Sequence, residues 1–223
     1  MDKINDIFHP IDFETWERRP YFYFFTKMLP TGYSLTVKMD ITPTYEAVKE
    51  RGQSFFAAYL YVTLRQLSRQ EEFRISTVDG KLGSFDYLNP SFAVLHDDDK
   101  SMSNMWVQYS DSFRDFYANY EQDMALYKNN HGIVAKPAPP PANSCMIGMV
   151  PWIEFEHYSP VPYAQGDCFF PVIQAGKYTM HDGRLIMPYS FTSHHAVADG
   201  YHVSEFLDGV QKQFYNPHLW IDK

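Results

Sequence analysis

The sequence predicts a two-layer α/β (α+β) sandwich, in which helices pack on one side of a mixed β-sheet. Three observations predict this class: helical patterns alternate with short β-like segments, two Asp-Gly pairs mark hairpin turns, and one long segment has strongly amphipathic helical spacing. We expect a single domain over residues 1–223, because this length suits one large core and the apolar patterns continue on both sides of the only proline-rich stretch, at 136–142.

Two helices are predicted before the first hairpin. Thr42 can cap a short helix that runs to Arg51 and ends at Gly52. Ser54 can cap a second helix that runs to about Arg69.

The middle of the chain predicts strands followed by the amphipathic helix. Strand patterns cover 73–78, 81–87, 91–96 and 103–109, and Asp79-Gly80 provides the turn between the first two. Helical spacing of aromatic and apolar residues then extends over 111–129. These residues are Phe113, Phe116, Tyr117, Tyr120, Met124 and Tyr127.

The last third predicts the rest of the sheet and a closing helix. Apolar stretches at 145–155 and 168–180 precede the strand 184–193, with a second turn at Asp182-Gly183, and a helix covers about 201–215. The proline-rich stretch is expected to form a surface loop.

Charge and composition exclude several classes of protein. The chain of 223 residues has 19 basic and 27 acidic side chains, a formal net charge of −8, which makes nucleic acid an unexpected partner. The longest apolar stretch, 55–64, is too short to cross a membrane, and the first residues do not resemble a signal peptide. Cys145 and Cys168 form no disulfide framework and are expected to be small buried side chains. We therefore expect a soluble cytoplasmic protein without a membrane partner.

The outstanding local feature is a histidine pair between a strand and a helix. His194 and His195 are followed by Asp199, at the expected helix N-cap, and by His202. Adjacent strand residues point to opposite faces, so the two histidines cannot both serve one site from regular strand geometry. Three interpretations remain open: a structural junction, a histidine base with a supporting carboxylate, and a zinc site, which the spacing favours least.

The segment 194–207 resembles the active-site segment of the chloramphenicol acetyltransferase family. Further matches follow in the family's order: Trp16-Glu17-Arg18-Arg19, 29–36, 150–152, 175–178 and 182–185. The resemblance therefore covers essentially the whole chain. An HxxxDG motif alone is shared with the lipoyl acyltransferase cores of 2-oxoacid dehydrogenases, but the doubled histidine and the N-terminal Trp-x-Arg-Arg favour the chloramphenicol branch.

The resemblance implies the fold, the reaction and the assembly. It implies a homotrimer with active sites at subunit interfaces, acetyl-CoA as co-substrate, no metal, and chloramphenicol or a similar hydroxylated small molecule as acceptor. His195 corresponds to the general base and His194 to a structural residue. Asp199 corresponds to an aspartate that pairs with Arg18, holds the loop of the base and does not contact the histidine directly. The chemistry is consistent with the residue types, because a neutral imidazole can take the proton of a hydroxyl that attacks a thioester.

Several positions depart from the family pattern. Gly148 occupies the place of a serine that stabilises the oxyanion in the family, and a water in the vacated space or the Gly148 N–H could partly substitute for it. Lys177 and Tyr178 match positions that bind CoA. The acceptor pocket corresponds to Phe24, Phe25, Leu29, Met146, Tyr158, Pro160 and Gln174, and Phe25 and the last four differ from the residues expected there. The sequence thus leaves two alternatives open: an acyltransferase for a different hydroxyl or amine acceptor, and a catalytically weakened trimeric binding protein.

Overall fold

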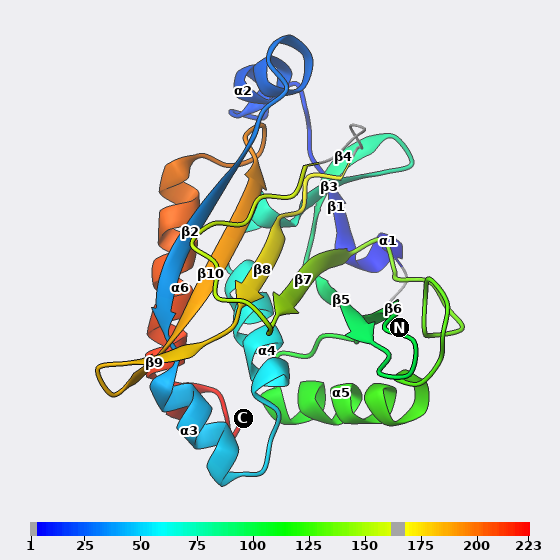
Figure 1. Cartoon of the computed structure of the whole chain (residues 1–223). Helices are drawn as coiled ribbons and strands as arrows, with labels where there is room; N and C mark the ends of the chain where they lie inside the picture. The colour runs from blue at the N-terminus through cyan, green and yellow to red at the C-terminus, as the bar shows by residue number, and fades with distance from the viewer. Residues whose placement is uncertain (1–3, 162–167) are drawn as a thin grey trace.

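The computed structural model describes residues 4–161 and 168–223 and contains one large mixed sheet (Figure 1). Its strands pair in the order β2-β10-β8-β7-β5-β6, and β9 pairs with the start of β10. The β8–β7 and β7–β5 pairs are parallel and the other pairs are antiparallel. The strands are β2 (Gly32–Asp40), β5 (Asn89–Leu95), β6 (Met102–Trp106), β7 (Ser144–Val150), β8 (Val172–Gly176), β9 (Thr179–His181) and β10 (Arg184–His194).

A smaller antiparallel sheet lies beside the end of the large one. It has the order β1-β4-β3 and follows the short helix α1 (Ile4–Ile7). Its strands are β1 (Phe8–Pro10), β3 (Ile75–Val78) and β4 (Lys81–Phe85).

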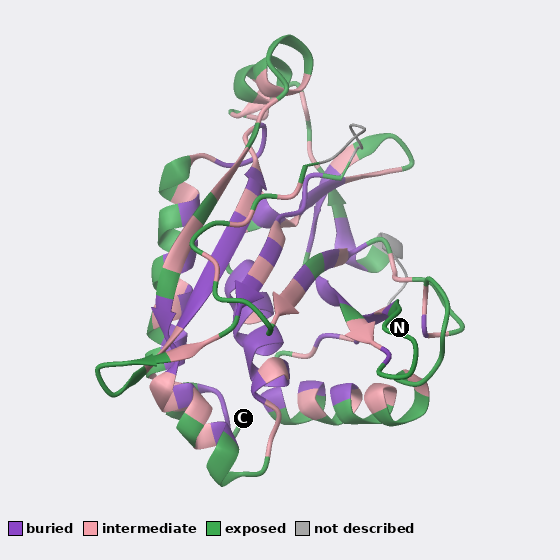
Figure 2. Ribbon diagram, in the orientation of Figure 1, coloured by how far each residue is buried: buried purple, intermediate pink, exposed green. Residues whose placement is uncertain are grey.

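The longer helices lie on one side of the large sheet, which confirms the predicted fold class (Figure 1). The central one, α4, is buried along nearly its whole length between the sheet and its neighbours, while the outer side of α6 is exposed (Figure 2). In β8, Ile173 and Ala175 are buried, whereas Val172 and Gln174 on the alternate face are only half-buried. The helices are α3 (Thr42–Glu50), α4 (Phe55–Leu67), α5 (Phe113–Tyr127) and α6 (Gly200–Tyr215).

The opposite face of the sheet carries no helix in the described residues and is crossed by the segment after β7. The backbone N–H of Tyr158 donates to Thr36 on β2, and its carbonyl accepts from Ser190 on β10. We call this side the open face. Beyond the end of the sheet, α2 (Arg19–Tyr23) continues into a π-helical turn, η1 (Phe24–Met28), and two 3₁₀ turns complete the chain, η2 (Glu71–Arg74) and η3 (Pro217–Leu219).

Local signals explain most of the element boundaries. The Ser54 hydroxyl accepts from the backbone of Ala57 at the start of α4, as predicted, and Gly52 has a φ of +66° after α3. Both Asp-Gly turns have positive φ at each residue, as a type I′ hairpin requires. The prediction for Thr42 was wrong: it is the first residue of α3, and the Asp40 carboxylate accepts from its N–H at 3.0 Å.

None of the helices in the described part of the chain combines the length and apolar character needed to cross a bilayer. The proline-rich stretch lies between α5 and β7, as predicted for a surface loop, and its Ala138 carbonyl accepts from the Trp106 indole.

Candidate active site

His195 lies just after β10, in a short loop (residues 195–199) that leads into α6. Its backbone N–H donates to the Thr31 carbonyl at 2.9 Å, which continues the pairing of β10 with β2. Its ring stacks on Phe25, with centroids 4.0 Å apart and planes 6° from parallel, and also contacts Tyr33 at 5.0 Å. The side chain keeps 29% of its surface exposed, so the imidazole is fixed but accessible.

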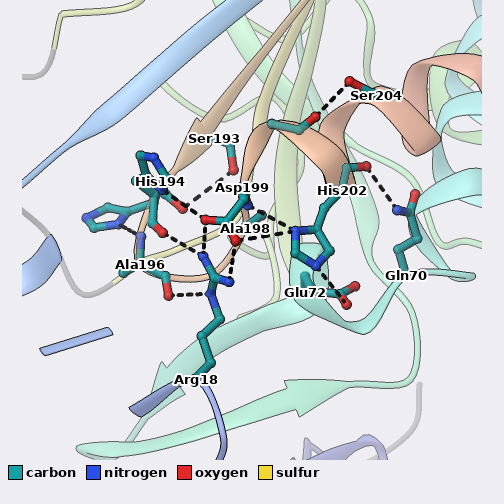
Figure 3. Close-up of polar contacts among 12 residues, drawn as sticks. Arg18, Gln70, Glu72, Ser193, His194, Ala196, Ala198, Asp199, His202 and Ser204 are labelled. Atoms are coloured by element: carbon teal, nitrogen blue, oxygen red, sulfur yellow. Dashed lines mark hydrogen bonds and ion pairs between the residues drawn. The ribbon is translucent and has the colours of Figure 1, made fainter. Parts of the chain in front are cut away.

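Arg18 holds the His195 loop through four hydrogen bonds (Figure 3). Its guanidinium binds both carboxylate oxygens of Asp199, at 2.8 and 2.7 Å, and also the carbonyls of His195 and Ala196, each at 2.9 Å. These bonds lower the pKa of Asp199, the hydrogen bonding from Arg18 being the largest cause. A bidentate, charge-assisted pair therefore joins the start of the chain to the loop that carries His195.

The Asp199 carboxylate also approaches His195, which differs from the expectation of no direct contact. Its Oδ1 lies 3.2 Å from Nδ1 of His195. The two atoms lack hydrogen-bond geometry, and Nδ1 is buried with no hydrogen-bond partner among the described residues. The carboxylate is nevertheless close enough to stabilise a positive charge on the ring.

The two neighbouring histidines have structural contacts. Nδ1 of His194 accepts from the backbone of Ala196 at 3.1 Å, and Nδ1 of His202 accepts from the backbone of Asp199 at 3.0 Å (Figure 3). Burial lowers the pKa of His194, and the proximity of His195 adds to this effect. In both rings Nδ1 therefore accepts a backbone N–H, which fixes the orientation of the imidazole.

The candidate zinc ligands do not form one group. Among the described residues, His194, His195, Asp199 and His202 do not bring three ligand atoms together, whereas Asp98, Asp99 and His131 do, where the exposed loop after β5 meets the segment after α5. That group is a solvated acidic cluster with a histidine between two carboxylates.

The open face contains a cavity of about 520 Å³ near the end of β10. Of the predicted acceptor residues it includes Met146 and Pro160, while Phe24, Phe25, Leu29 and Tyr158 lie outside its wall. Cys168 is exposed and lines the cavity, so the prediction of a buried side chain was wrong for it, although Cys145 is buried. Sequence reasoning missed Thr31, Tyr33, Ser34, Ser159, Phe170, Val172, Thr192 and Ser193, which also line it.

Gln174 occupies the space beside Gly148. The two residues are paired across the parallel strands β7 and β8, and a Cβ placed on Gly148 would lie 2.7 Å from the nearer heteroatom of the Gln174 amide. The glutamine amide therefore occupies the space in which a side chain at 148 would begin.

The remaining predicted residues lie away from His195 within one chain. Gln174 is paired with Ser190 on β10, five residues before His195, which corresponds to about 16 Å of extended strand. Lys177 and Tyr178 follow β8 and lie still further toward the other end of the sheet. Tyr178 packs against Tyr45 and Phe55, and burial raises its pKa to about 12.

Comparisons with known proteins agree on one family. The model of the family "Chloramphenicol acetyltransferase" matches residues 6–211. A chloramphenicol acetyltransferase from Clostridium perfringens is 33% identical over 215 residues, covering 96% of this chain and 98% of its own. One from Staphylococcus aureus is 33% identical over 206 residues, with coverage of 92% and 97%.

Solved structures show the same relationship. A chloramphenicol acetyltransferase superposes with a TM-score of 0.84 at 26% identity, covering 92% of this chain and 99% of that one. The dihydrolipoamide acetyltransferase of Azotobacter vinelandii, at 18% identity and a TM-score of 0.62, covers 85% of this chain and 83% of its own, and shares the fold. The chain therefore belongs to the chloramphenicol acetyltransferase family and is an acyltransferase.

Proposed function

We propose that this protein transfers the acetyl group of acetyl-CoA to a hydroxyl of chloramphenicol or a similar small molecule, with His195 as the general base. One observation carries the proposal: the His195 ring is accessible, stacked on Phe25 and presented by a loop that Arg18 clamps. Such fixed orientation is what proton transfer from a bound alcohol requires.

The proposed reaction uses the imidazole twice. Because Nδ1 is buried beside Asp199, Nε2 is the nitrogen that takes the hydroxyl proton while the hydroxyl oxygen bonds to the thioester carbonyl carbon. The carbonyl oxygen becomes an oxyanion, and its collapse breaks the carbon–sulfur bond. The imidazolium returns the proton to the CoA thiolate. Asp199 stabilises the imidazolium between these steps, because its carboxylate lies 3.2 Å from the ring.

We further propose that the active site is formed between copies of the chain in a homotrimer. In one chain, His195 is about 16 Å along the strand from the level of Gln174 and Gly148, and Lys177 and Tyr178 lie beyond them. A second copy that presents its open face to His195 would bring the base, the cavity and the CoA residues onto one substrate pair. In this arrangement Lys177 meets a CoA phosphate and Tyr178 lies near the adenine.

The acceptor is proposed with one alternative. Met146 and Pro160 in the cavity wall are not the residue types that the family pattern has at these positions. Phe25 offers no hydroxyl to a bound substrate. A site that lacks a hydrogen-bonding group can discriminate strongly between acceptors. A different hydroxyl or amine acceptor is therefore the second candidate.

Thiol release from acetyl-CoA tests the proposal directly. We expect release that depends on chloramphenicol, and a loss of at least about 10²-fold in His195→Ala, the range for removing a general base. His9→Ala removes an exposed histidine that pairs with Asp86 at the small sheet; it is the control and should remain active. Release that is unchanged in His195→Ala would reject the mechanism. Release with another alcohol or amine alone would favour the second candidate, and none with any acceptor would indicate a binding protein.

A further inference from the structure

The side chain of Gln174 lies where a hydrogen-bond donor is needed, and we propose that its amide N–H stabilises the oxyanion in place of a residue at position 148. The inference rests on the proposed acyl transfer. The nearer heteroatom of the amide lies 2.7 Å from the ideal Cβ position of Gly148, and the farther one lies 3.3 Å from it. The glutamine thus places a polar group within bonding reach of the place where a side chain at 148 would begin.

Backbone contacts determine which amide atom points there. The Gln174 oxygen accepts from the N–H of Met149 at 2.9 Å and from the N–H of Val150 at 3.1 Å, because this orientation pairs an acceptor with two donors. The amide nitrogen is then the atom nearest Gly148. Two backbone donors therefore fix the amide and leave its N–H₂ facing the space beside Gly148.

No neighbouring side chain on these two strands can take this role. Residues 144, 146, 148, 150, 172, 174 and 176 have their side-chain positions on the open face, and of these Ser144 and Gln174 carry an N–H or O–H group. Ser144 lies four residues before Gly148, about 13 Å along β7, so Gln174 is the donor beside Gly148. Met146 and Val172, each two residues before Gly148 or Gln174 on its strand, line the open-face cavity. Gln174 is half-buried, so its amide can reach a ligand at this surface.

The chemistry needs only a donor, with no proton transferred to the oxygen. As the acceptor oxygen bonds to the thioester carbon, the carbonyl π electrons move to oxygen, and a pre-oriented N–H stabilises that charge. The charge is lost again when the carbon–sulfur bond breaks. In the proposed trimer, Gln174 of one copy and His195 of the next act on the two sides of the same tetrahedral carbon.

Gly148 and Gln174 form a matched pair under this proposal. A serine at 148 would meet the glutamine amide at 2.7 Å from its Cβ, closer than real Cβ atoms approach such groups. Gly148→Ser alone therefore lowers activity by displacing the donor. Gly148→Ser with Gln174→Thr, which removes the obstruction, restores activity to within about tenfold of the wild type, since one donor replaces another.

The experiment compares Gln174→Met and Gln174→Glu with the wild type. Methionine keeps the length without a donor, and removal of one oxyanion donor lowers kcat by about 10²–10³ with little change in acceptor KM. Glutamate keeps an oxygen that can accept from Met149 and Val150, but its second oxygen brings a negative charge toward the oxyanion. We therefore expect kcat to fall further in Gln174→Glu than in Gln174→Met. Gln211→Met is the matched control: that amide binds only the backbone of Asp40, and kcat should stay within about threefold.

Two reactions are measured so that the two proposals fail separately. Besides transfer to chloramphenicol, slow acetyl-CoA hydrolysis without acceptor passes through the same type of oxyanion. If chloramphenicol is not the acceptor, hydrolysis by the wild type and its loss in Gln174→Met still support the donor role. Active wild-type protein with kcat unchanged in Gln174→Met and Gln174→Glu overturns the donor role alone. Wild-type protein without thiol release in either reaction overturns the proposed function and the donor role with it.

Discussion

The His195 loop and the β7–β8 part of the open face illustrate two ways of building half of an active site. His195 and Asp199 in the loop, and Arg18 near the start of the chain, each match the family pattern, and four hydrogen bonds from the Arg18 guanidinium hold the loop. At the strands, Gly148 departs from the pattern and its neighbour Gln174 fills the gap. The loop keeps the residues of the family pattern, whereas the strand pair departs from it at both positions.

Removing Arg18 should have the largest effect and tests whether the loop really depends on one residue. In Arg18→Ala we expect kcat to fall by about 10²-fold, because a small misplacement of a catalytic group has this cost. We also expect the unfolding free energy to fall by about 1–3 kcal/mol, because the hydrogen bonds of the guanidinium are lost. Activity assays and urea unfolding measure both. Arg19→Ala is the control, since Arg19 makes an exposed ion pair with Glu14 and should change little. Near-normal kcat in Arg18→Ala would mean that the loop is held without the clamp.

Adding a methyl group at Gly148 tests the packing at the strands. Gly148→Ala should lower the unfolding free energy by about 0.5–1.5 kcal/mol, because its Cβ would push aside the end of the Gln174 side chain and weaken its hydrogen bonds to the backbone. In a Gln174→Ala background the same change should cost much less, which a double-mutant cycle will show. Gly200→Ala is the control, since its Cβ would meet nothing within 4 Å. Equal costs in the two backgrounds would show that the pair is not coupled.

Acidification should produce the smallest effect and separates the charged loop from the uncharged strands. Arg18 lowers the pKa of Asp199 below its unfolded value, so the ion pair contributes stability above about pH 4 and loses it as pH falls through the folded pKa. The stability difference between wild type and Asp199→Asn should therefore be constant near neutrality and shrink below about pH 4. Unfolding measured at one protein concentration gives this difference, and Asp182→Asn, at an exposed hairpin turn, corrects for the loss of a negative charge. A difference that stays constant down to pH 2 would contradict the assignment.

The sequence predicts features that depend on neighbours in the chain. The Asp-Gly turns, the Ser54 cap and the α5 stripe were predicted because dihedral preference, capping and helical spacing are local. Thr42 was misassigned because its hydroxyl donates to the Asp40 carboxylate and accepts from the distant Leu185 N–H, so it does not cap the helix.

The candidate site also has one part that a local sequence pattern predicts and one part that it does not. Its loop residues were identified from a contiguous motif and its resemblance to a family. The contact of Gln174 with Gly148 was not, because it depends on the register of two parallel strands 26 positions apart, which no local pattern encodes. Cys168 was misjudged for a similar reason, since its exposure depends on how the segment before β8 lies over the open face.

The clamp between Arg18 and Asp199 spans 181 positions, so the catalytic loop is set only when both ends of the polypeptide are present. A nascent chain on the ribosome cannot acquire the base in working order until its last quarter has emerged. If the backbone were divided at the exposed stretch near 136–142, each piece would carry one half of the clamp. Regained turnover on mixing would then report directly on reassembly, which makes this stretch a natural place to divide the protein into a complementing pair.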